Sequence, residues 1–410
     1  MIKLAHIAKE RHTPMTPPQA HPVFAQGGTT VFEVFSSLAR ETGAINLGQG
    51  FPDHGEPAEV IAAAAKALET RSNQYPPMMG VPELRQAVAD HAARFYNLDV
   101  DPMREVMVTS GATEALTAAI LTFVQPGDEV VTFEPMYDSY APMIRRAGGI
   151  VRPVRLNGPD WTADPQALEA AFGPRTRAVI VNNPMNPTGK LFSLEELTTI
   201  AQLCQRHDVI AIADEVYEHL VFDNQRFTPL ISVPGMRERT LRIGSAGKTF
   251  SLTGWKVGYI TAAPALMGPV SRCHQFLTFT TPPALQYGVA HGLGFGEDYF
   301  SALSNRMGAK RDLLAQALTR LGFKLNSCAG TYFLITDISG LAQEGEDDTD
   351  FVMRMTKEAG VAAIPVSAFY KNDPPQNLVR FCFCKNDGIL DDAVTRLNNH
   401  FHATPAKGNG

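Results

Sequence analysis

The sequence predicts an α/β protein, with a mostly parallel β-sheet covered by helices on both faces and a smaller α+β domain beside it. Three observations lead to this prediction. Short apolar runs alternate with helical patterns between residues 106 and 262. After about residue 300 this alternation gives way to longer helices and isolated strands. The length of 410 residues is also more than one small core needs, so two domains are expected.

The larger domain is expected to supply the sheet. Apolar runs typical of strands occur at 106–109, 128–133, 177–181, 209–213, 241–244 and 257–262, and helical patterns at 114–124, 139–147 and 194–206. Ser193 is a typical N-cap for the last of these helices, and Glu196 completes a capping box. Short apolar strands that alternate with helices favour a parallel sheet. Such sheets bind ligands beyond the carboxyl ends of their strands.

The smaller domain is expected to combine helices at 307–321, 349–359 and 387–401 with strands at 331–337 and 378–384. The acidic run 343–348 is predicted to be a solvated loop. The segment before Val31 is interpreted as an extended arm, and the tail 404–410 as disordered. We therefore predict an N-terminal arm with part of the small domain at 1–50, a large domain at 51–295 and a small C-terminal domain at 296–410.

Composition and charge exclude several classes of function. Hydrophobic residues make up 44% and charged residues 19% of the chain, which is ordinary for a globular protein. The net charge of −6 offers no basic surface, so a nucleic-acid partner is not expected. The amino terminus has no apolar signal core. No stretch approaches the run of about 20 apolar residues that a membrane span needs. We expect a soluble cytoplasmic protein without a membrane partner.

The five cysteines do not suggest disulfides or a metal site. Their number is odd and their spacing scattered, which argues against a disulfide framework. Cys382 and Cys384 would share one face of a strand, but the sequence offers no partners for a metal ion. Buried, reduced thiols are expected, and no metal is predicted.

The most informative stretch of the sequence surrounds Lys248. This lysine lies in the small, flexible run Ser245–Thr249, directly after a predicted strand. Small residues let a bulky planar ligand approach the backbone, and a lysine held there can form a Schiff base with an aldehyde. Ser245 and Lys256 add a hydroxyl and a positive charge that suit a phosphate. Aldehyde plus phosphate indicates pyridoxal 5′-phosphate (PLP). For an isolated Gly-Lys-Thr, a surface lysine in a turn would be the better interpretation.

Polar residues follow two other predicted strands. Asp214 comes directly after the run 209–213, with Tyr217 three residues later. A buried carboxylate beside the ring nitrogen of PLP would keep that nitrogen protonated, as electron withdrawal by the ring requires. Asn186 lies in the turn 182–189. The alternatives are an Asp-Glu pair that caps a strand and a proline-rich turn.

A candidate anion site lies at the start of the helix 114–124. Gly111, Ala112 and Thr113 join a predicted strand to this helix, and backbone N–H groups at a helix start attract anions. A glycine-containing turn of this kind is weak evidence when taken alone. Tyr137 and Tyr140 follow the next strand, and for Tyr140 a place in the apolar core remains an alternative.

Together these segments resemble fold-type I PLP enzymes, the aspartate aminotransferase superfamily of class I and II. The resemblance covers about residues 25–400 and implies a three-layer PLP-transferase fold for the large domain. It implies that Lys248 binds PLP, that Asp214 faces the ring nitrogen and that Tyr217 and Asn186 reach the ring hydroxyl, with Lys248, Asp214 and Tyr217 catalytic. The remaining implied cofactor contacts are Gly111, Ala112, Thr113, Ser245 and Lys256 near the phosphate, Tyr137 stacked on the ring and Tyr75 from a second subunit of a homodimer.

Two segments resemble one branch of this superfamily, the kynurenine aminotransferase, glutamine transaminase K and methionine aminotransferase group. They are Ile45–Asp53 and Leu378–Cys384. Arg380 matches the arginine that binds the substrate α-carboxylate, and a guanidinium can do so with two parallel hydrogen bonds. Gly50 matches a backbone N–H that meets the same carboxylate. An arginine at a solvated strand edge is the alternative, although its apolar neighbours do not favour it.

The resemblance also implies a substrate side-chain pocket. Phe32 stands where mammalian members of the branch have a tryptophan, and Thr280 where they have a histidine. A pocket built from Phe32, Tyr137, Phe279 and Tyr332 would be apolar. Such a pocket favours methionine, glutamine, leucine or aromatic substrates, and methionine-type transamination is the preferred prediction.

The predicted function is that of a homodimeric PLP aminotransferase, which moves the amino group of an apolar or neutral amino acid to a 2-oxo acid. The same chemistry could expel a β-substituent, so a C–S β-lyase acting on cysteine S-conjugates is the alternative. A non-catalytic PLP-binding regulator is a remote alternative. Such regulators carry an appended DNA-binding domain, and the segment before residue 30 leaves no room for one.

Overall fold

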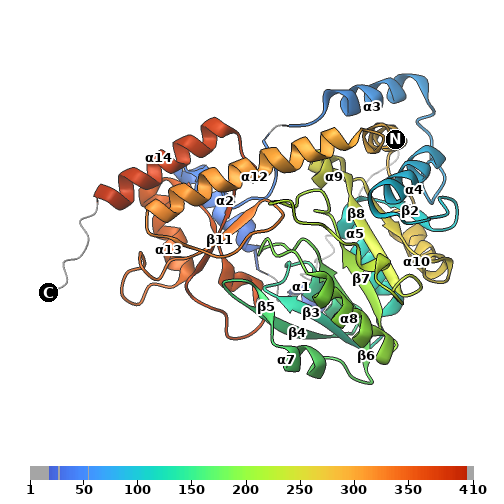
Figure 1. Ribbon diagram of the computed structural model, residues 1–410, viewed down its shortest axis with the longest axis horizontal. Helices are drawn as coiled ribbons and strands as arrows, with labels where there is room; N and C mark the ends of the chain where they lie inside the picture. Colours follow the sequence, from blue (N-terminus) through green and yellow to red (C-terminus); the bar gives the residue numbers. More distant parts are fainter. Residues whose placement is uncertain (1–17, 26–27, 54, 404–410) are drawn as a thin grey trace, which may run out of the picture.

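The computed structural model describes residues 18–25, 28–53 and 55–403 (Figure 1). These residues form a large sheet, a smaller sheet of four strands and a separate pair of short strands. The larger sheet has eight strands in the order β2-β9-β8-β7-β6-β3-β4-β5. Pairing is parallel from β8 through β7, β6 and β3 to β4, and antiparallel for β2–β9, β9–β8 and β4–β5. In chain order the strands are β2 Val106–Thr109, β3 Glu129–Glu134, β4 Ile150–Asn157, β5 Thr162–Ala163, β6 Thr176–Asn182, β7 Ile210–Asp214, β8 Thr240–Ser245 and β9 Gly258–Thr261. The predicted α/β class with a mostly parallel sheet is confirmed.

Alternate residues of the central strands bury two opposite faces of this sheet. In β6, Ala178 and Ile180 pack in one apolar cluster, whereas Val179 and Val181 pack in another. The helices α5 (Gly111–Phe123), α6 (Tyr140–Arg146) and α10 (Pro264–Leu277) cover the first face. Helix α8 (Leu194–Arg206) covers the second and begins with the predicted capping box of Ser193 and Glu196. A third cluster packs α3 (Ala58–Thr70), α4 (Pro82–Tyr96) and α11 (Pro283–Leu293) around β2.

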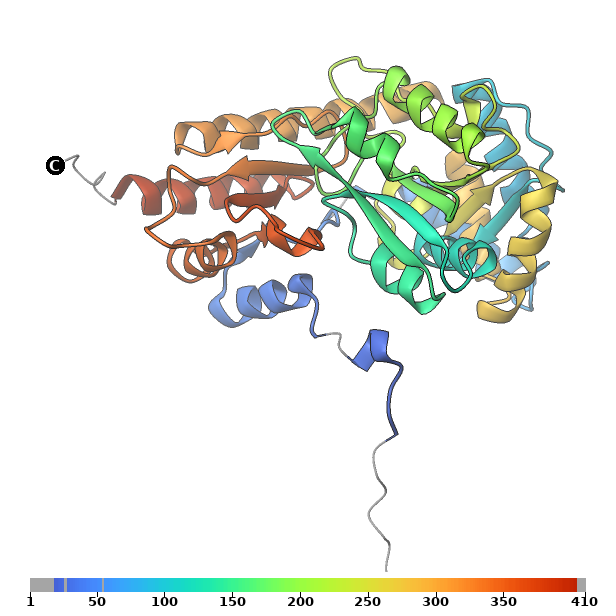
Figure 2. The same ribbon diagram turned by 90° about the horizontal axis from the view of Figure 1, so that it is seen from below.

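The smaller sheet is antiparallel, in the order β10-β11-β14-β13, and lies at the opposite end of the molecule from the large sheet (Figures 1 and 2). Its strands are β10 Lys324–Leu325, β11 Phe333–Asp337, β13 Ile364–Pro365 and β14 Leu378–Cys382, and its helices are α2 Val31–Thr42, α13 Asp348–Arg354 and α14 Asp387–Ala403. The N-terminal part of the chain joins this body through β1 (Ile45–Asn46), which pairs with β12 (Val361–Ala362). The predicted domain limits 1–50, 51–295 and 296–410 stay predictions.

Helix α12 (Glu297–Arg320) connects the two bodies and starts ten residues before the predicted 307. Its first turn carries Glu297 and Asp298, which suit the positive end of a helix dipole. Phe300 and Leu303 continue the apolar face of the helix into the core. Ser304 donates to the carbonyl of Val221 in the large body. The prediction missed this start because its apolar pattern began only at Met307.

The prediction of a solvated acidic loop at 343–348 is wrong for its last three residues. Glu346 pairs with Arg354 at 2.7 Å. Asp347 accepts a hydrogen bond from the N–H of Asp350 as the N-cap of α13. Asp348 is fully buried and accepts from the N–H and the hydroxyl of Ser367. Charge alone predicted solvent exposure, but these carboxylates have specific donors.

Other predictions concern the termini and the cysteines. Residues 1–17 and 404–410 lie outside the described residues, and the described part of the N-terminal arm includes the short helix α1 (Pro22–Ala25). All five cysteines are free, and the Sγ atoms of Cys382 and Cys384 are 3.2 Å apart on one side of the chain. No helix within the described part of the chain is both long enough and apolar enough to cross a bilayer.

A buried ion network lies behind the turn that follows β7. Arg242 on β8 is 1% exposed and contacts the carboxylates of Glu215, at 2.7 Å, and Glu218. Burial raises the pKa of Glu215 to about 7. Burial also acts to raise the pKa of Glu218, but Arg242 and the neighbouring histidines outweigh it and lower this pKa to about 2. The network therefore depends on the one guanidinium.

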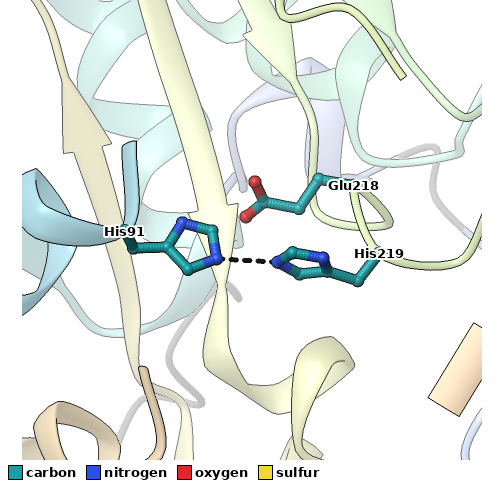
Figure 3. A group of neighbouring side chains, drawn as sticks. All are labelled: His91, Glu218 and His219. Atoms are coloured by element: carbon teal, nitrogen blue, oxygen red, sulfur yellow. Dashed lines mark hydrogen bonds between the residues drawn. The ribbon is translucent and has the colours of Figure 1, made fainter. Parts of the chain in front are cut away.

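Two histidines complete this network (Figure 3). The Nε2 atoms of His91 and His219 are 2.7 Å apart, and Glu218 lies beside them. Burial lowers the pKa of His91 to about 3 and that of His219 to about 4, so both rings are neutral near pH 7. Because Glu218 also accepts from Tyr96 and Arg242, we interpret the group as a hydrogen-bonded network rather than a metal centre.

Replacing Arg242 is predicted to destabilise the fold strongly. Arg242→Met leaves two carboxylates buried without their cation, a change that typically costs about 3–5 kcal/mol. Arg177→Met is the matched control, because this arginine on β6 is 49% exposed and pairs with Asp128 at 3.5 Å. The control should change stability by less than about 1 kcal/mol. Urea unfolding at one protein concentration measures both, and equal losses would contradict the prediction.

Candidate active site

A cavity of about 220 Å³ lies at the carboxyl edge of the large sheet. Its position follows from the parallel pairing, since β6, β7 and β8 end side by side. In register, Asn182 of β6 pairs with Asp214 of β7, and Asp214 with Ile243 of β8. Ten of the predicted cofactor residues line the cavity: Gly111, Ala112, Thr113, Tyr137, Asn186, Asp214, Tyr217, Ser245, Lys248 and Lys256.

One end of the cavity combines a helix N-terminus with a lysine. Gly111 starts α5 with φ at +75°, a conformation that favours glycine. A Cβ built on Gly111 would lie 3.2 Å from the Nζ atom of Lys256, so this ammonium sits against the first turn of the helix. A Cβ on Gly258 would lie 2.7 Å from the Gly111 carbonyl carbon and 2.8 Å from the Ala112 nitrogen. Free N–H groups and a cation together suit an anion such as a phosphate.

The side chain of Asp214 presents two different oxygens. Oδ2 accepts a 2.5 Å hydrogen bond from the hydroxyl of Tyr140. Oδ1 is buried and has no hydrogen-bond partner among the described residues. Burial raises the pKa of Asp214 to about 6, against the opposing effects of Tyr140, the Val216 N–H and Lys248. A buried carboxylate oxygen without a donor in a cavity fits a protonated ring nitrogen, so the residues present fit PLP.

Lys248 lies on the short helix α9 (Ala246–Thr249) at the end of β8. Its Nζ donates to the hydroxyl of Tyr332 at 3.1 Å, and Tyr332 donates to the carbonyl of Gly50 at 3.0 Å. The same Nζ lies 5.6 Å from the centre of the Tyr217 ring. Burial lowers the pKa of Lys248. The amine is therefore neutral at a lower pH than an ordinary lysine, as a nucleophile or proton carrier requires.

Arg380 is 1% exposed and reaches the cavity through Asn186. It donates from Nη1 to Asn186 Oδ1 at 2.9 Å and from Nη2 to the carbonyl of Gly48 at 2.6 Å, while Nε has no partner among the described residues. Burial lowers the pKa of Arg380 to about 10. The solvated strand edge considered as an alternative is excluded by this burial.

Three phenylalanine rings surround the Arg380 guanidinium. The ring centres of Phe333, Phe32 and Phe369 lie 4.0, 5.1 and 5.3 Å from its carbon. Phe32 was predicted at this site. Phe333 and Phe369 were missed, because ordinary core packing accounts for their sequence contexts equally well. A Cβ on Gly50 would lie 2.3 Å from the Phe333 ring, so only a residue without a side chain fits there.

Six predicted site residues are not among those that line the cavity. Four of them, Gly50, Phe32, Tyr332 and Arg380, belong to the contacts of Lys248 and Arg380 described above, and the other two are Tyr75 and Phe279. Tyr75 is 83% exposed, and Phe279 is 38% exposed. Their rings pack edge to face with centres 5.5 Å apart. Tyr140, which the sequence left as a core aromatic or a site residue, is buried and bonded to Asp214.

The chain is similar to known aminotransferases over most of its length. A model of the family "aminotransferase class I and II" matches residues 42–397. The probable N-succinyldiaminopimelate aminotransferase of Mycobacterium tuberculosis is 44% identical, with 90% of this chain and 96% of the relative covered. The methionine aminotransferase of Escherichia coli is 40% identical over 91% of this chain and 96% of the relative. Human kynurenine–oxoglutarate transaminase 1 is 40% identical over 88% and 94%.

Solved structures agree with these relatives. The structure of N-succinyldiaminopimelate aminotransferase from Mycobacterium tuberculosis superposes with a TM-score of 0.88 at 43% identity, covering 92% of this chain and 99% of that one. A structure from Escherichia coli, whose reactivity identifies a methionine aminotransferase function, gives a TM-score of 0.90 at 39% identity, covering 93% and 100%.

Gly258→Ala is predicted to weaken binding of PLP, the cofactor expected from the sequence. The added methyl group would meet the Gly111–Ala112 backbone at less than 3.0 Å, and such overpacking typically costs about 1–3 kcal/mol. The dissociation constant, measured by titrating apoprotein with PLP, should rise by about tenfold or more. Gly254→Ala is the control, because its methyl group would meet nothing within 4 Å. Equal affinities for the two variants would contradict this account.

Proposed function

The chain belongs to the class I and II aminotransferases, which are PLP-dependent enzymes, and we propose that it transfers the amino group of an apolar or neutral amino acid to a 2-oxo acid. The choice of an apolar or neutral amino donor rests on one observation, the number of positively charged side chains at the site. Lys248 and Lys256 are the cations among the described residues that line the cavity. We assign Lys248 to the cofactor aldehyde, Lys256 to the phosphate and Arg380 to the α-carboxylate of the substrate.

Within this chain, no further described cation lines the cavity to neutralise a carboxylate in the substrate side chain. An anionic side chain would lose its hydration without gaining a partner, which is unfavourable. The rings of Phe32, Phe333 and Phe369 beside Arg380 favour an apolar side chain instead. The names of the relatives from Escherichia coli and from human, a methionine and a kynurenine transaminase, support the same direction.

The residues at the site are assigned as follows. PLP supplies an aldehyde and an electron-withdrawing ring. Arg380 holds the α-carboxylate with two parallel N–H groups, which orients the α-carbon. Lys248, which is hydrogen-bonded to Tyr332 and has a pKa lowered by burial, would take the proton from that carbon and deliver it to the former aldehyde carbon of the cofactor. Asp214 holds a proton at the ring nitrogen, and Tyr217 and Asn186 bind the ring hydroxyl.

A substrate panel tests the proposed donor class directly. Methionine, glutamine and aromatic amino acids should exceed aspartate in kcat/KM with a common 2-oxo acid. A preference for aspartate, or for N-succinyldiaminopimelate as the name of the 44% identical relative suggests, would refute the assigned pocket. Release of pyruvate from a cysteine S-conjugate, measured in the same panel, separates the β-lyase alternative from transamination. The cytoplasmic location stays a prediction.

Lys248 is predicted to hold the cofactor covalently. Borohydride treatment of the purified protein should fix PLP on Lys248, as found by peptide mass spectrometry. Lys248→Ala should lose both this adduct and multiple-turnover activity. Lys256→Ala is the matched control from the same cavity, and it should keep the adduct while binding PLP more weakly. An adduct on any other lysine would refute the assignment.

Arg380→Ala is predicted to lower kcat/KM by at least about tenfold for every amino acid and 2-oxo acid. A lost charge-assisted pair costs about 2–5 kcal/mol, and both half-reactions use the same contact. Arg380→Lys should restore only part of the activity, because an ammonium lacks the planar fork. A decarboxylated amine provides an internal control, since it lacks the carboxylate and should be insensitive to the change. A near wild-type kcat/KM in Arg380→Ala would be incompatible with this role.

We also propose that the enzyme is a homodimer with shared sites. Tyr75 and Phe276 are 83% and 84% exposed, which is unusual for large aromatic side chains and suits a surface that a second copy covers. Tyr75 would then reach the phosphate in the partner. Mixing Tyr75→Ala with Lys248→Ala subunits should recover activity toward about a quarter of wild type, because half of the random dimers contain one complete site. Additive residual activities after mixing would contradict shared sites.

A further inference from the structure

The hydrogen bond between Tyr140 and Asp214 separates the two oxygens of this carboxylate. Both side chains belong to residues that are 4% exposed. Oδ2 accepts from the Tyr140 hydroxyl at 2.5 Å, and Oδ1 is the atom without a partner among the described residues. Tyr140 therefore anchors one oxygen of Asp214, and the other oxygen has no described partner beside the cavity that Asp214 lines.

Tyr140 is itself held rigidly by apolar packing. It is the first residue of α6 and belongs to the buried cluster that also contains Met136 and Ile144. Its ring meets the Tyr137 ring edge to face, with centres 5.6 Å apart. One tyrosine thus supports both the carboxylate proposed for the ring nitrogen and the ring proposed to stack on the cofactor.

The chemistry of this contact favours one protonation state. A phenol O–H donates a stronger hydrogen bond to a carboxylate than to a neutral carboxylic acid. Burial works in the opposite direction, because it favours the neutral acid. The other groups around Asp214 are the Val216 N–H, which donates to it, the Lys248 amine and the hydroxyls of Tyr137 and Tyr217. Of the contributions that lower the pKa of Asp214, the bond from Tyr140 is the largest.

We infer that Tyr140 is a positioning residue that keeps Asp214 ionised and aimed at the ring nitrogen, so that the proton between them stays on the nitrogen. This inference rests on the proposed role of Asp214. If the hydroxyl is removed, the carboxylate becomes more basic and the shared proton moves toward Asp214. A cofactor ring bound there would then withdraw electrons less effectively.

The first test uses the apoprotein and needs no cofactor. Aspartate labelled with ¹³C at the carboxyl carbon is titrated by NMR, and Asp214→Asn identifies the Asp214 signal. Tyr140→Phe should raise the pKa of Asp214 by about one pH unit, a tenfold change in its acid dissociation constant. An unchanged pKa would overturn the inference and leave Tyr140 as packing only.

The second test locates the proton in the holoenzyme. With ¹⁵N-labelled PLP, the nitrogen chemical shift reports how much of the ring is protonated. Tyr140→Phe should lower this fraction, and 3,5-difluorotyrosine at position 140, a stronger donor of nearly the same shape, should raise it. The difluoro variant keeps the test decisive if Tyr140→Phe does not fold.

Tyr96→Phe is the matched control, because it removes a hydroxyl that donates to another buried carboxylate, Glu218, behind the site. It should leave the pKa of Asp214 and the ring-nitrogen signal unchanged. Equal shifts in both variants, or shifts of the same sign for the phenylalanine and difluorotyrosine variants, would overturn the inference. A borohydride adduct away from Lys248 would instead refute the proposed function, so the two failures are distinguishable.

Discussion

The parallel pairing of β6, β7 and β8 is the constraint on which the rest of the site depends. Parallel strands direct their carboxyl ends to one edge, and the register places Asn182 beside Asp214 there. Lys248 lies three residues beyond the end of β8, five residues after Ile243, which pairs with Asp214. Residues separated by more than sixty positions in the chain meet in one cavity because this register sets the carboxyl ends of the strands side by side.

Burial then sets the chemistry of the residues that meet. It raises the pKa of Asp214 and lowers those of Lys248 and Arg380. Each of these pKa shifts disfavours the charged form, so the charge of each side chain depends on the hydrogen-bond partners that offset the effect of burial. Asp214 has Tyr140, Arg380 has Asn186 and a backbone carbonyl, and Lys248 has mainly a neutral hydroxyl. The amine is accordingly the group best suited to carry a proton.

The turn after β7 links this chemistry to stability. Asp214 and Tyr217 line the cavity, whereas Glu215 and Glu218 contact Arg242 on the other side. The same few residues thus line the candidate site on one side and form a buried ion network behind it. A network of this kind adds little net stability compared with apolar packing, but it is strongly destabilising when one partner is lost. Because Glu215 and Glu218 flank Tyr217 in the chain, the network anchors the turn that carries Tyr217.

Local patterns in the sequence predicted the fold class and most element positions, and together with the family resemblance they predicted ten of the residues that line the cavity. Helix α8 begins and ends where its capping box and apolar period place it, because these signals act within a few residues. Tertiary structure alone decided the rest. Phe333 and Phe369 face Arg380, Asp348 is buried against Ser367, and Tyr140 donates to Asp214. Each of these side chains contacts a residue that is distant in the sequence and becomes a neighbour only after folding. The local sequence indicates whether a residue suits a core or a loop, but it does not indicate which donor or ring the side chain will contact.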